Sequence, residues 1–342
     1  MERYEALPPI SGEAVTTGAD DWVLSADVGG TAIGVGVVSP EGEVRLAREV
    51  PTLGRGPGTA LQTILEVVGE TGEQARALGI GLAGCGIGVP GAVDVRTGRI
   101  GPDVQNLPEL AGCPLAEWIR GPTGLPTVVD NDVNALALGE ARFGAARGLR
   151  SFVLLALGTG VGGGLYLDGD LVRGASGYGG EVGHMTVRFD GRPCFCGSRG
   201  CLKAYVAGPD IAAQAREGLS DHPGSSLHQV GPETLSAPAV FRAAAAGDVL
   251  AVGVVARVCH ALGAAIGSLM NGFNPEAVLL AGGVAQALGA HLDRVVHHAR
   301  AYALAGAAAA ARVVIVPTTK TTTVRGPAAL FLHEAVRRSP AA

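Results

Sequence analysis

The chain has 342 residues and a formal net charge of −5 at pH 7, and it is long enough for two domains with buried cores. No basic stripe marks a nucleic-acid surface, and we find neither a signal peptide nor an apolar run of transmembrane length. Of the six cysteines, three are scattered (Cys85, Cys113 and Cys259), which is typical of a reducing compartment. We therefore expect a soluble, cytoplasmic protein without nucleic-acid or membrane partners.

The N-terminal part predicts a disordered leader over residues 1–21, which lack periodicity, followed by an α/β arrangement. From Trp22 a strand runs into a glycine turn, Asp27-Val28-Gly29-Gly30-Thr31, and a second strand returns from it. A Glu41-Gly42 hairpin turn then leads into a third strand. The next expected elements are a helix at 58–70 and a buried strand at 79–86.

The same pattern returns in the middle of the chain. A strand from Phe152 ends in the turn Gly158-Thr159-Gly160, and a second strand returns over 162–167 to a hairpin turn at Asp168-Gly169. Two β-turn-β units, each built on a Gly/Thr turn, predict an α/β protein with the two-lobed, actin-like (ribonuclease-H-like) ATPase fold. The alternative is that two glycine hairpins recur by chance in a chain with 54 glycines.

This repetition predicts the domain boundaries. We expect a smaller N-terminal lobe over 22–131 plus 325–342, and a larger lobe over 132–324. The C-terminal half shows Ala, Leu and Val at helical spacing, with a Ser/Gly/Pro-rich loop at 218–237. The elements expected there are helices at 209–217, 238–246 and 248–271, strands at 275–281 and 312–316, and a closing helix at 324–337.

The two Gly/Thr turns suit phosphate groups. Gly29 and Gly30 let backbone N–H groups approach phosphate oxygens, and the hydroxyl of Thr31 adds a donor. Asp27 could reach a Mg²⁺ ion directly or through water. Gly158-Thr159-Gly160 forms the opposing phosphate loop of the second lobe. We therefore expect ATP and Mg²⁺ as cofactors.

A third glycine turn, Gly282-Gly283-Val284, follows a buried strand and precedes a helix. It permits the backbone to approach a flat ligand closely. A plain strand-to-helix turn is the alternative interpretation.

A polar cluster from Asp130 to Asn134 lies where a strand passes into a helix, a common location for catalytic groups in α/β folds. Phosphoryl transfer to a hydroxyl needs a carboxylate that orients the nucleophile and accepts its proton. Asp132 is the candidate base. Alternatively, Asp132 only caps the following helix.

The stretch 177–203 contains four good zinc ligands, His184, Cys194, Cys196 and Cys201. One imidazole with three thiolates forms the closed tetrahedral set that is typical of a structural zinc site. We expect a zinc knuckle over 184–201, with Glu181 directed into the same neighbourhood. The alternatives are ordinary buried thiols or a disulfide.

The sequence Glu-x-Gly-His followed by Cys-x-Cys-Gly-x-x-Gly-Cys resembles the signature of the ROK family of bacterial sugar kinases and sugar-responsive repressors, and the resemblance runs from about residue 22 to the last helix. It implies that Asn131 and Asp132 hold the 3-, 4- and 6-hydroxyls of a sugar, and that Glu181 and His184 hold the 1- and 2-hydroxyls. It also makes 282–284 the adenosine-side turn and suggests a homodimer or homotetramer. Further substrate segments implied by the resemblance are Gly88-Val89-Pro90-Gly91 and Asn106-Leu107-Pro108, where Asn106 could equally be a turn residue.

One position departs from the family pattern. The motif usually ends Gly-Cys-x-Glu, and here it ends Gly200-Cys201-Leu202-Lys203. An ammonium donates hydrogen bonds where a carboxylate accepts them, so Lys203 favours a substrate with a carbonyl or another acceptor at the anomeric end. The alternative is that Lys203 swings to solvent or pairs with Glu181 and changes little.

The resemblance therefore implies an ATP-dependent kinase for the terminal primary hydroxyl of a hexose-like sugar or cyclitol. Lys203 favours an aminosugar or a C7-cyclitol of an antibiotic pathway, and an ordinary glucokinase is the alternative. Repressors of this family carry an N-terminal helix-turn-helix, for which the 21 residues before the first strand, an acidic segment, leave little room. A binding protein without catalysis is disfavoured because Asp27, Thr31, Thr159 and Asp132 are intact.

Overall fold

The computed structural model describes residues 21–231 and 233–338, so nearly all of the predicted leader lies outside the described residues. The chain divides into two compact units. The first ends at Gly144 and resumes at Thr319, and the second is Ala145–Thr318. This differs from the expected boundaries at 131/132 and 324/325, because helix α3 (Asp132–Phe143) packs against the closing helix α11 (Lys320–Arg338) of the first unit.

The first unit is built on a five-stranded sheet of order β3-β2-β1-β4-β7. Strands β1, β2 and β3 pair antiparallel, whereas β4 and β7 run parallel to β1. The strands are β1 (Trp22–Val28), β2 (Ala32–Val38), β3 (Val44–Pro51), β4 (Leu82–Val89) and β7 (Thr127–Asn131). The other elements of this unit are α1 (Ala60–Ala77), α2 (Leu115–Thr123), η1 (Pro108–Leu110) and the small hairpin β5 (Val93–Asp94) and β6 (Arg99–Ile100).

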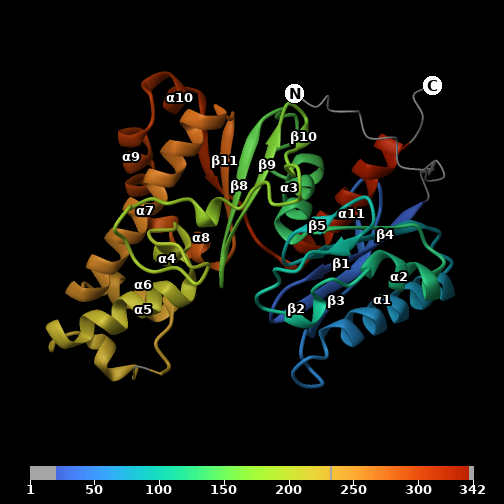
Figure 1. Cartoon of the computed structure of the whole chain (residues 1–342), viewed down its shortest axis with the longest axis horizontal. Helices are drawn as coiled ribbons and strands as arrows, with labels where there is room; N and C mark the ends of the chain where they lie inside the picture. Colours follow the sequence, from blue (N-terminus) through green and yellow to red (C-terminus); the bar gives the residue numbers. More distant parts are fainter. Residues whose placement is uncertain (1–20, 232, 339–342) are drawn as a thin grey trace. The chain divides into compact units, whose positions relative to one another are not determined.

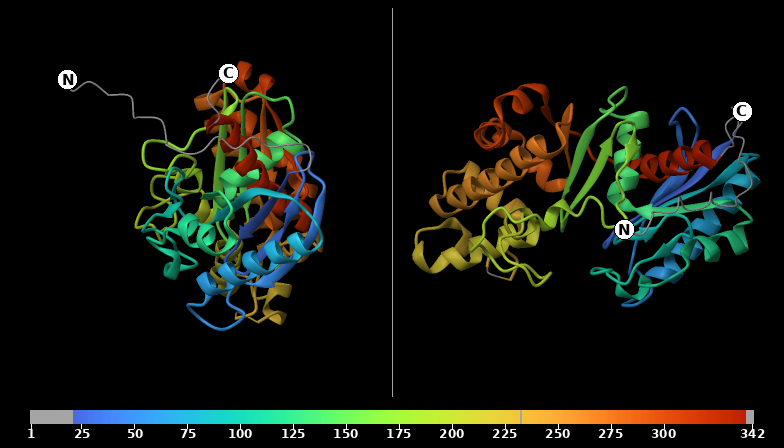
Figure 2. Two further views of the ribbon diagram at one scale, coloured as in Figure 1. Left: turned by 90° about the vertical axis from the view of Figure 1, so that its right-hand side faces the viewer. Right: turned by 45° about the horizontal axis from the view of Figure 1, so that its top comes forward.

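The two faces of this sheet differ because large side chains and glycines alternate along β4. Cys85, Ile87 and Val89 belong to the buried cluster that α1 and α2 complete. The alternate positions are glycines, and a Cβ atom at Gly86 would lie 1.8 Å from the carbonyl oxygen of Pro327 in α11. Helix α11 can therefore lie directly on the backbone of β4, on the face opposite to α1 (Figure 1, and the right view of Figure 2).

The second unit repeats the strand arrangement of the first. Its sheet has the order β10-β9-β8-β11-β12, in which β8 and β9 form the antiparallel hairpin and β11 and β12 run parallel to β8. The predicted echo of the two β-turn-β units is thus present in the structure. The strands are β8 (Phe152–Leu157), β9 (Val161–Leu167), β10 (Asp170–Leu171), β11 (Ala277–Ala281) and β12 (Arg312–Ile315).

Helices cover one face of this second sheet (Figure 1). The helices are α4 (Lys203–Val206), α5 (Gly208–Gly218), α6 (Ala237–Ala245), α7 (Val249–Phe273), α8 (Gly283–Ala287), α9 (Leu292–Tyr302) and α10 (Ala305–Ala310). Single turns of 3-10 helix are η2 (Val182–His184), η3 (Leu219–Asp221), η4 (Ser226–Gln229) and η5 (Gly289–His291).

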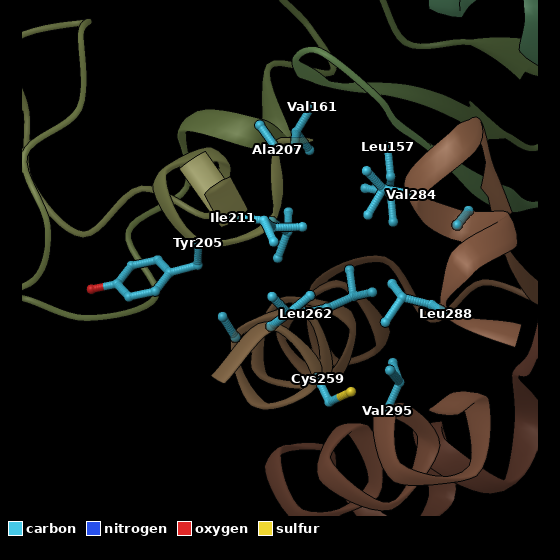
Figure 3. Close-up of a cluster of buried hydrophobic side chains, with 14 of the residues drawn as sticks. Leu157, Val161, Tyr205, Ala207, Ile211, Cys259, Leu262, Val284, Leu288 and Val295 are labelled. Atoms are coloured by element: carbon cyan, nitrogen blue, oxygen red, sulfur yellow. The ribbon is translucent and has the colours of Figure 1, made fainter. Parts of the chain in front are cut away.

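Helix α7 is the centre of the second core. Its inner side carries Cys259 and Leu262, which meet side chains from α5, α8 and α9 (Figure 3). By length and composition it could cross a membrane, contrary to the expectation that no such run exists, and 56% of its most apolar window is buried within the unit. Packing against α6 and α9 accounts for that hydropathy.

Candidate functional site

Three parallel strands of the first unit bring predicted site residues into one row. The strand register places Asp27 of β1 beside Gly88 of β4, and Gly88 beside Asp130 of β7. A Cβ atom at Gly88 would lie 3.2 Å from the Cα of Asp132, so only a small residue allows this approach. Because the carboxyl ends of parallel strands share one edge of the sheet, Asp27 and Asp132 lie in one neighbourhood.

The electrostatics of Asp27 are those of a cation site. Desolvation at the strand end, and then the negative charge of Asp132, raise the pKa of Asp27 to about 8. Two carboxylates that disfavour each other's ionisation fit a hard divalent cation, because the cation removes the repulsion and accepts oxygen ligands. Asp27 therefore fits the role of a Mg²⁺ ligand.

The first glycine turn is closed by its own hydrogen bond and is held by a second one from Thr52. The N–H of Gly29 donates to the carbonyl oxygen of Ala32 at 2.9 Å, closing the turn between β1 and β2. Thr52, which was not predicted from the sequence, donates its hydroxyl to the carbonyl oxygen of Gly29 at 2.7 Å. A Cβ atom at Gly30 would lie 3.2 Å from the Cβ of Asn106. The structure thus places Asn106 beside the predicted phosphate turn.

Asn131, and not Asp132, caps α3. The Oδ1 of Asn131 accepts hydrogen bonds from the N–H groups of Val133 and Asn134, at 2.9 and 3.2 Å. Its Nδ2 donates to the carbonyl oxygen of Gly91 at 3.2 Å, which ties the cap to the turn that carries Gly88 and Pro90. The interpretation of Asp132 as the N-cap residue is therefore wrong. Asp132 is the first residue of α3, where the positive end of the helix favours a carboxylate.

The sequence did not predict the hydrogen bonds that Asp130 at the end of β7 makes with Asn131 and with Asn134 in α3. Asp130 is buried, and its Oδ1 accepts from the N–H of Asn131 at 2.7 Å and from the Nδ2 of Asn134 at 3.1 Å. These bonds fix the backbone just before Asp132. The available sequence signal was the spacing of four between Asp130 and Asn134, one turn of helix apart.

In the second unit, glycines explain the Glu-x-Gly-His sequence. Residues 182–184 form the single turn η2, which lies against β9. A Cβ atom at Gly183 would lie 2.1 Å from the carbonyl oxygen of Val161, so the close contact requires glycine. Glu181 precedes the turn and His184 ends it, and residues three apart in such a turn lie on the same side. The N–H of His184 donates to the carbonyl oxygen of Glu181 at 3.0 Å, so the turn brings the backbones of these two predicted substrate residues together.

The predicted zinc ligands converge. The ligand atoms of His184, Cys194, Cys196 and Cys201 all lie within 4.8 Å of one another. The Nδ1 of His184 is 3.7 Å from the Sγ of Cys194, and the Sγ atoms of Cys196 and Cys201 are also 3.7 Å apart. Tetrahedral zinc with thiolate ligands implies sulfur–sulfur distances of about 3.8 Å. All the cysteines are free, so the disulfide alternative is wrong and the set fits a zinc ion.

The knuckle is anchored to the core of the second unit. Tyr205 belongs to the buried cluster, and its hydroxyl, which points away from that cluster in Figure 3, accepts the N–H of Arg192 at 3.0 Å. The guanidinium of Arg192 donates to both carboxylate oxygens of Glu217 in α5, at 2.7 Å each. Inside the knuckle, a Cβ atom at Gly200 would lie 1.6 Å from the carbonyl oxygen of Arg188. The loop is therefore fixed at several points besides the metal ligands.

Lys203 has a partner that neither alternative named. Its Nζ lies 2.9 Å from the Oδ2 of Asp210 in the first turn of α5, and these side chains are only 18% and 24% exposed. The same Nζ lies 4.6 Å from the centroid of the Phe195 ring. The expectation that Lys203 pairs with Glu181 or swings to solvent is thus wrong, because Asp210 and the ring hold it within the unit.

The remaining two glycine turns adjoin the start of α5. The carbonyl oxygen of Gly158 accepts the N–H of Gly208 at 2.8 Å, and Gly158 donates to Gly160 at 3.0 Å. Gly282 has a φ of +93°, and a Cβ atom there would lie 2.5 Å from the carbonyl oxygen of Leu157. Turns that are more than a hundred residues apart in sequence are thus side by side, as a nucleotide subsite requires.

Comparison with known proteins finds relatives along most of the chain. The family model described as "ROK family" matches residues 23–334. The glucokinase of Halalkalibacterium halodurans is 37% identical over 294 residues, which are 84% of this chain and 87% of that protein. The N-acetylmannosamine kinase of Citrobacter koseri is 32% identical over 274 residues, which are 80% of this chain and 87% of that protein.

Solved structures of ROK family proteins also match most of the chain. A ROK hexokinase from Thermus thermophilus matches with a TM-score of 0.77 at 30% identity, covering 92% of this chain and 99% of that one. A ROK glucokinase from Streptomyces griseus in complex with glucose and AMPPNP matches with a TM-score of 0.73 at 30% identity, covering 90% and 98%. A ROK transcriptional regulator, a homologue of the E. coli MLC protein, matches with a TM-score of 0.82 at 27% identity, covering 94% and 79%. The prediction of the actin-like ATPase fold is confirmed.

Proposed function

Because this chain belongs to the ROK family, we propose that it transfers the γ-phosphoryl group of ATP to the terminal primary hydroxyl of a hexose-like acceptor. The enzyme is a sugar kinase. The observation that carries the proposal is the row of Asp27, Gly88 and Asp130 across three parallel strands, with Asp132 of α3 next to Gly88. This arrangement supplies a cation ligand, Asp27, and a base, Asp132, in one neighbourhood.

In the first unit, Asp132 orients the acceptor hydroxyl and takes its proton as the phosphoryl group is transferred. Gly29, Gly30 and Thr31 supply phosphate donors, and Asp27 holds Mg²⁺, which when bound neutralises phosphate charge. The acceptor ring contacts the Asn131 amide and Asn106, and the turn of Gly88 and Pro90 shapes its binding surface. The Oδ1 of Asn131 accepts from two backbone N–H groups and one N–H of its Nδ2 donates to Gly91, so we assign the second N–H of Nδ2 to the acceptor.

In the second unit, the turns at 158–160 and 282–284 receive the nucleotide. Glu181 and His184 hold two hydroxyls of the acceptor. The Nδ1 of His184 faces the thiolate set, so zinc fixes the ring tautomer and leaves Nε2 for the substrate. The role of the zinc in this proposal is structural.

The finer proposal concerns the acceptor. Lys203 carries three N–H donors and no acceptor, and Asp210 takes one of them. A hydrogen-bond donor that is held in place favours a substrate with a carbonyl group, such as a C7-cyclitol ketone or an N-acylated aminosugar, over plain glucose. We therefore propose a cyclitol or aminosugar kinase of antibiotic biosynthesis, working in the cytoplasm.

A glucokinase is the second candidate. It is favoured by the 37% identity to a glucokinase and by Asp210, whose carboxylate restores a hydrogen-bond acceptor beside Lys203. The two candidates differ in whether the ammonium of Lys203 or the carboxylate of Asp210 contacts the substrate.

We also propose that the enzyme is a homodimer or homotetramer. The first turn of α7 and the segment between α9 and α10 expose apolar side chains, including Val249 (76% exposed) and Leu304 (72% exposed). Light scattering coupled to size-exclusion chromatography measures the mass directly, and a monomer at micromolar concentration contradicts this part of the proposal.

The deciding experiment measures ADP release with Mg-ATP against glucose, mannose, N-acetylated and 3-amino hexoses, and a C7-cyclitol ketone. Lys203→Glu alone would set a new carboxylate close to Asp210, so the informative variant is Lys203→Glu combined with Asp210→Ala. The matched control is Arg188→Glu with Asp190→Ala, which makes the same charge change in an exposed pair of the knuckle loop.

Turnover of the ketone or aminosugar by the wild type, with glucose activity gained only in the Lys203/Asp210 variant, supports the finer proposal. Strong glucose turnover that both double variants retain establishes a glucokinase instead. No ADP release above background with any acceptor contradicts the kinase proposal itself.

A further inference from the structure

Phe195 stands between two metal ligands and touches a third. It separates Cys194 from Cys196, so the knuckle fixes its backbone on both sides. The edge-to-face contact of its ring with His184 has a centroid distance of 5.2 Å and an interplanar angle of 85°. A second contact of the ring is with the Nζ of Lys203, at 4.6 Å. A single side chain therefore connects the metal set to the position that departs from the family pattern.

Asp210 holds Lys203 from another direction. Its carboxylate belongs to the first turn of α5, where the positive end of the helix favours an anion. The pair is mostly shielded from water, at 18% and 24% exposure, so it is screened less than an exposed ion pair. A lysine has a flexible four-carbon stem and no preferred direction of its own. The ring and the carboxylate together supply that direction.

We infer that Phe195 and Asp210 are positioning residues that aim the ammonium of Lys203 at the acceptor, and that metal loading of the knuckle sets acceptor selectivity through Phe195. This inference rests on the proposed function for its selectivity statement, because Lys203 can select an acceptor only if the chain is a kinase. The contact between ring and ammonium can be tested without any substrate.

The structural test uses the lysine content. The chain contains two lysines, Lys203 and Lys320, so protein labelled with ¹³C at the lysine ε-carbon gives two side-chain NMR signals. Lys320→Arg assigns them. We expect ring-current displacement of the Lys203 signal in the zinc-loaded protein, and its loss both in Phe195→Leu and after removal of zinc by a chelator. Phe189→Leu is the matched control, because Phe189 lies in the same loop and is 95% exposed.

The selectivity test measures kcat and KM for the preferred acceptor and for a poor one. Phe195→Leu and Asp210→Ala should each raise KM for the preferred acceptor about tenfold with little change in kcat. The kcat/KM of the preferred acceptor divided by that of the poor acceptor should therefore move closer to one. Phe195→Trp and Asp210→Glu keep the ring and the carboxylate, so they should restore most of the ratio. Phe189→Leu should leave it unchanged.

The outcomes separate the two ideas. A Lys203 signal that is not displaced in the zinc-loaded wild type, or that Phe195→Leu leaves in place, overturns the inference whatever the enzyme does. If the signal responds as expected and the acceptor ratio does not change, the selectivity statement is overturned and the contact is only structural. If no acceptor is phosphorylated, the proposed function fails, and the NMR result still decides whether zinc and Phe195 position Lys203.

Discussion

Asp27 makes the metal-free protein less stable as the pH rises, and Asp27→Asn removes this effect. The pKa of Asp27 is raised to about 8 in the folded chain from an ordinary value near 3.8. The folded chain therefore keeps a proton that the unfolded chain has lost between about pH 4 and pH 8. Stability from this group is fully present below pH 4 and is lost as the pH rises through 8.

The size of the effect follows from the shift. One pKa unit corresponds to about 1.4 kcal/mol, so a shift of roughly four units sets a limit of about 5–6 kcal/mol. Asp27 is partly accessible to solvent, and residual hydration of its ionised carboxylate reduces the expected loss to about 3 kcal/mol. In Asp27→Asn this loss is absent, so the variant should exceed the wild type in unfolding free energy by about 3 kcal/mol at pH 8 and by little near pH 4.

Urea unfolding followed by tryptophan fluorescence is the suitable assay, because both tryptophans, Trp22 and Trp118, lie in the first unit with Asp27. The measurement is made with a chelator at several pH values from 4 to 8.5. Asp94→Asn is the control. Burial alone would raise the pKa of Asp94, but hydrogen bonds and the charge of Arg96 together outweigh burial and lower this pKa. The change in unfolding free energy caused by Asp94→Asn should be constant above pH 5. A wild-type-minus-Asp27→Asn difference that is equally flat refutes the reasoning.

Three further predictions concern the site. Asp132→Asn should lower kcat at least about a hundredfold while acceptor binding by calorimetry and the circular dichroism spectrum stay unchanged, and retained turnover excludes Asp132 as the base. Burial raises the pKa of the Cys201 thiol to about 12, so zinc has to displace the thiol proton in order to bind. The apparent zinc affinity, measured by competition with a chromogenic chelator, should therefore fall as the pH falls. An affinity that does not change with pH contradicts a thiolate ligand set. Gly183→Ala introduces a Cβ atom 2.1 Å from the carbonyl oxygen of Val161 and should lower kcat/KM about a hundredfold, whereas Gly69→Ala in α1, with nothing within 4 Å of the new atom, should leave it unchanged.

The sequence predicts the repeated β-turn-β units because glycine and threonine at a strand end indicate both a tight turn and a phosphate donor. It could not place the domain boundary. Helix α3 follows a strand of the first unit and was assigned to the second lobe, since nothing in its own sequence says which surface it packs on. That surface comes from Gly139 of α3, where a Cβ atom would lie 2.9 Å from the Cα of Gly326 in α11. Close contact between helices nearly two hundred residues apart leaves only isolated glycines as its signal.

The boundaries of the long elements were predicted to within a few residues where apolar periodicity is strong. Helix α7 was expected over 248–271 and extends over Val249–Phe273. Helix α1 was expected over 58–70 and continues to Ala77, because the segment after residue 70 is polar on its outer side and still buries Thr71 and Ala75. A half-buried helix end gives a weak periodic signal, and tertiary contacts decide its length.

Among the site residues, the metal ligands were predictable because their spacing is short and their chemistry is specific. The partner of Lys203 was not. Asp210 follows Lys203 by seven residues, and in one continuous helix residues two turns apart are about 10 Å apart, too far for an ion pair. The chain instead becomes extended at Ala207, which ends α4 and precedes α5. This corner folds the first turn of α5 back toward Lys203, and no local propensity predicts how far.

The pairing changes the meaning of the departure at position 203. Taken alone, lysine in place of glutamate adds two units of positive charge relative to the family pattern. With Asp210 at 2.9 Å, the two side chains form a nearly neutral pair that offers both a hydrogen-bond donor and a hydrogen-bond acceptor. Under the proposed function, specificity is therefore a property of the pair, and a single substitution at either residue leaves a charge without its partner and does not recreate the family pattern. The Phe195 ring also contacts the ammonium, so the proposed role of Phe195 links the chemistry at position 203 to the knuckle that holds that ring.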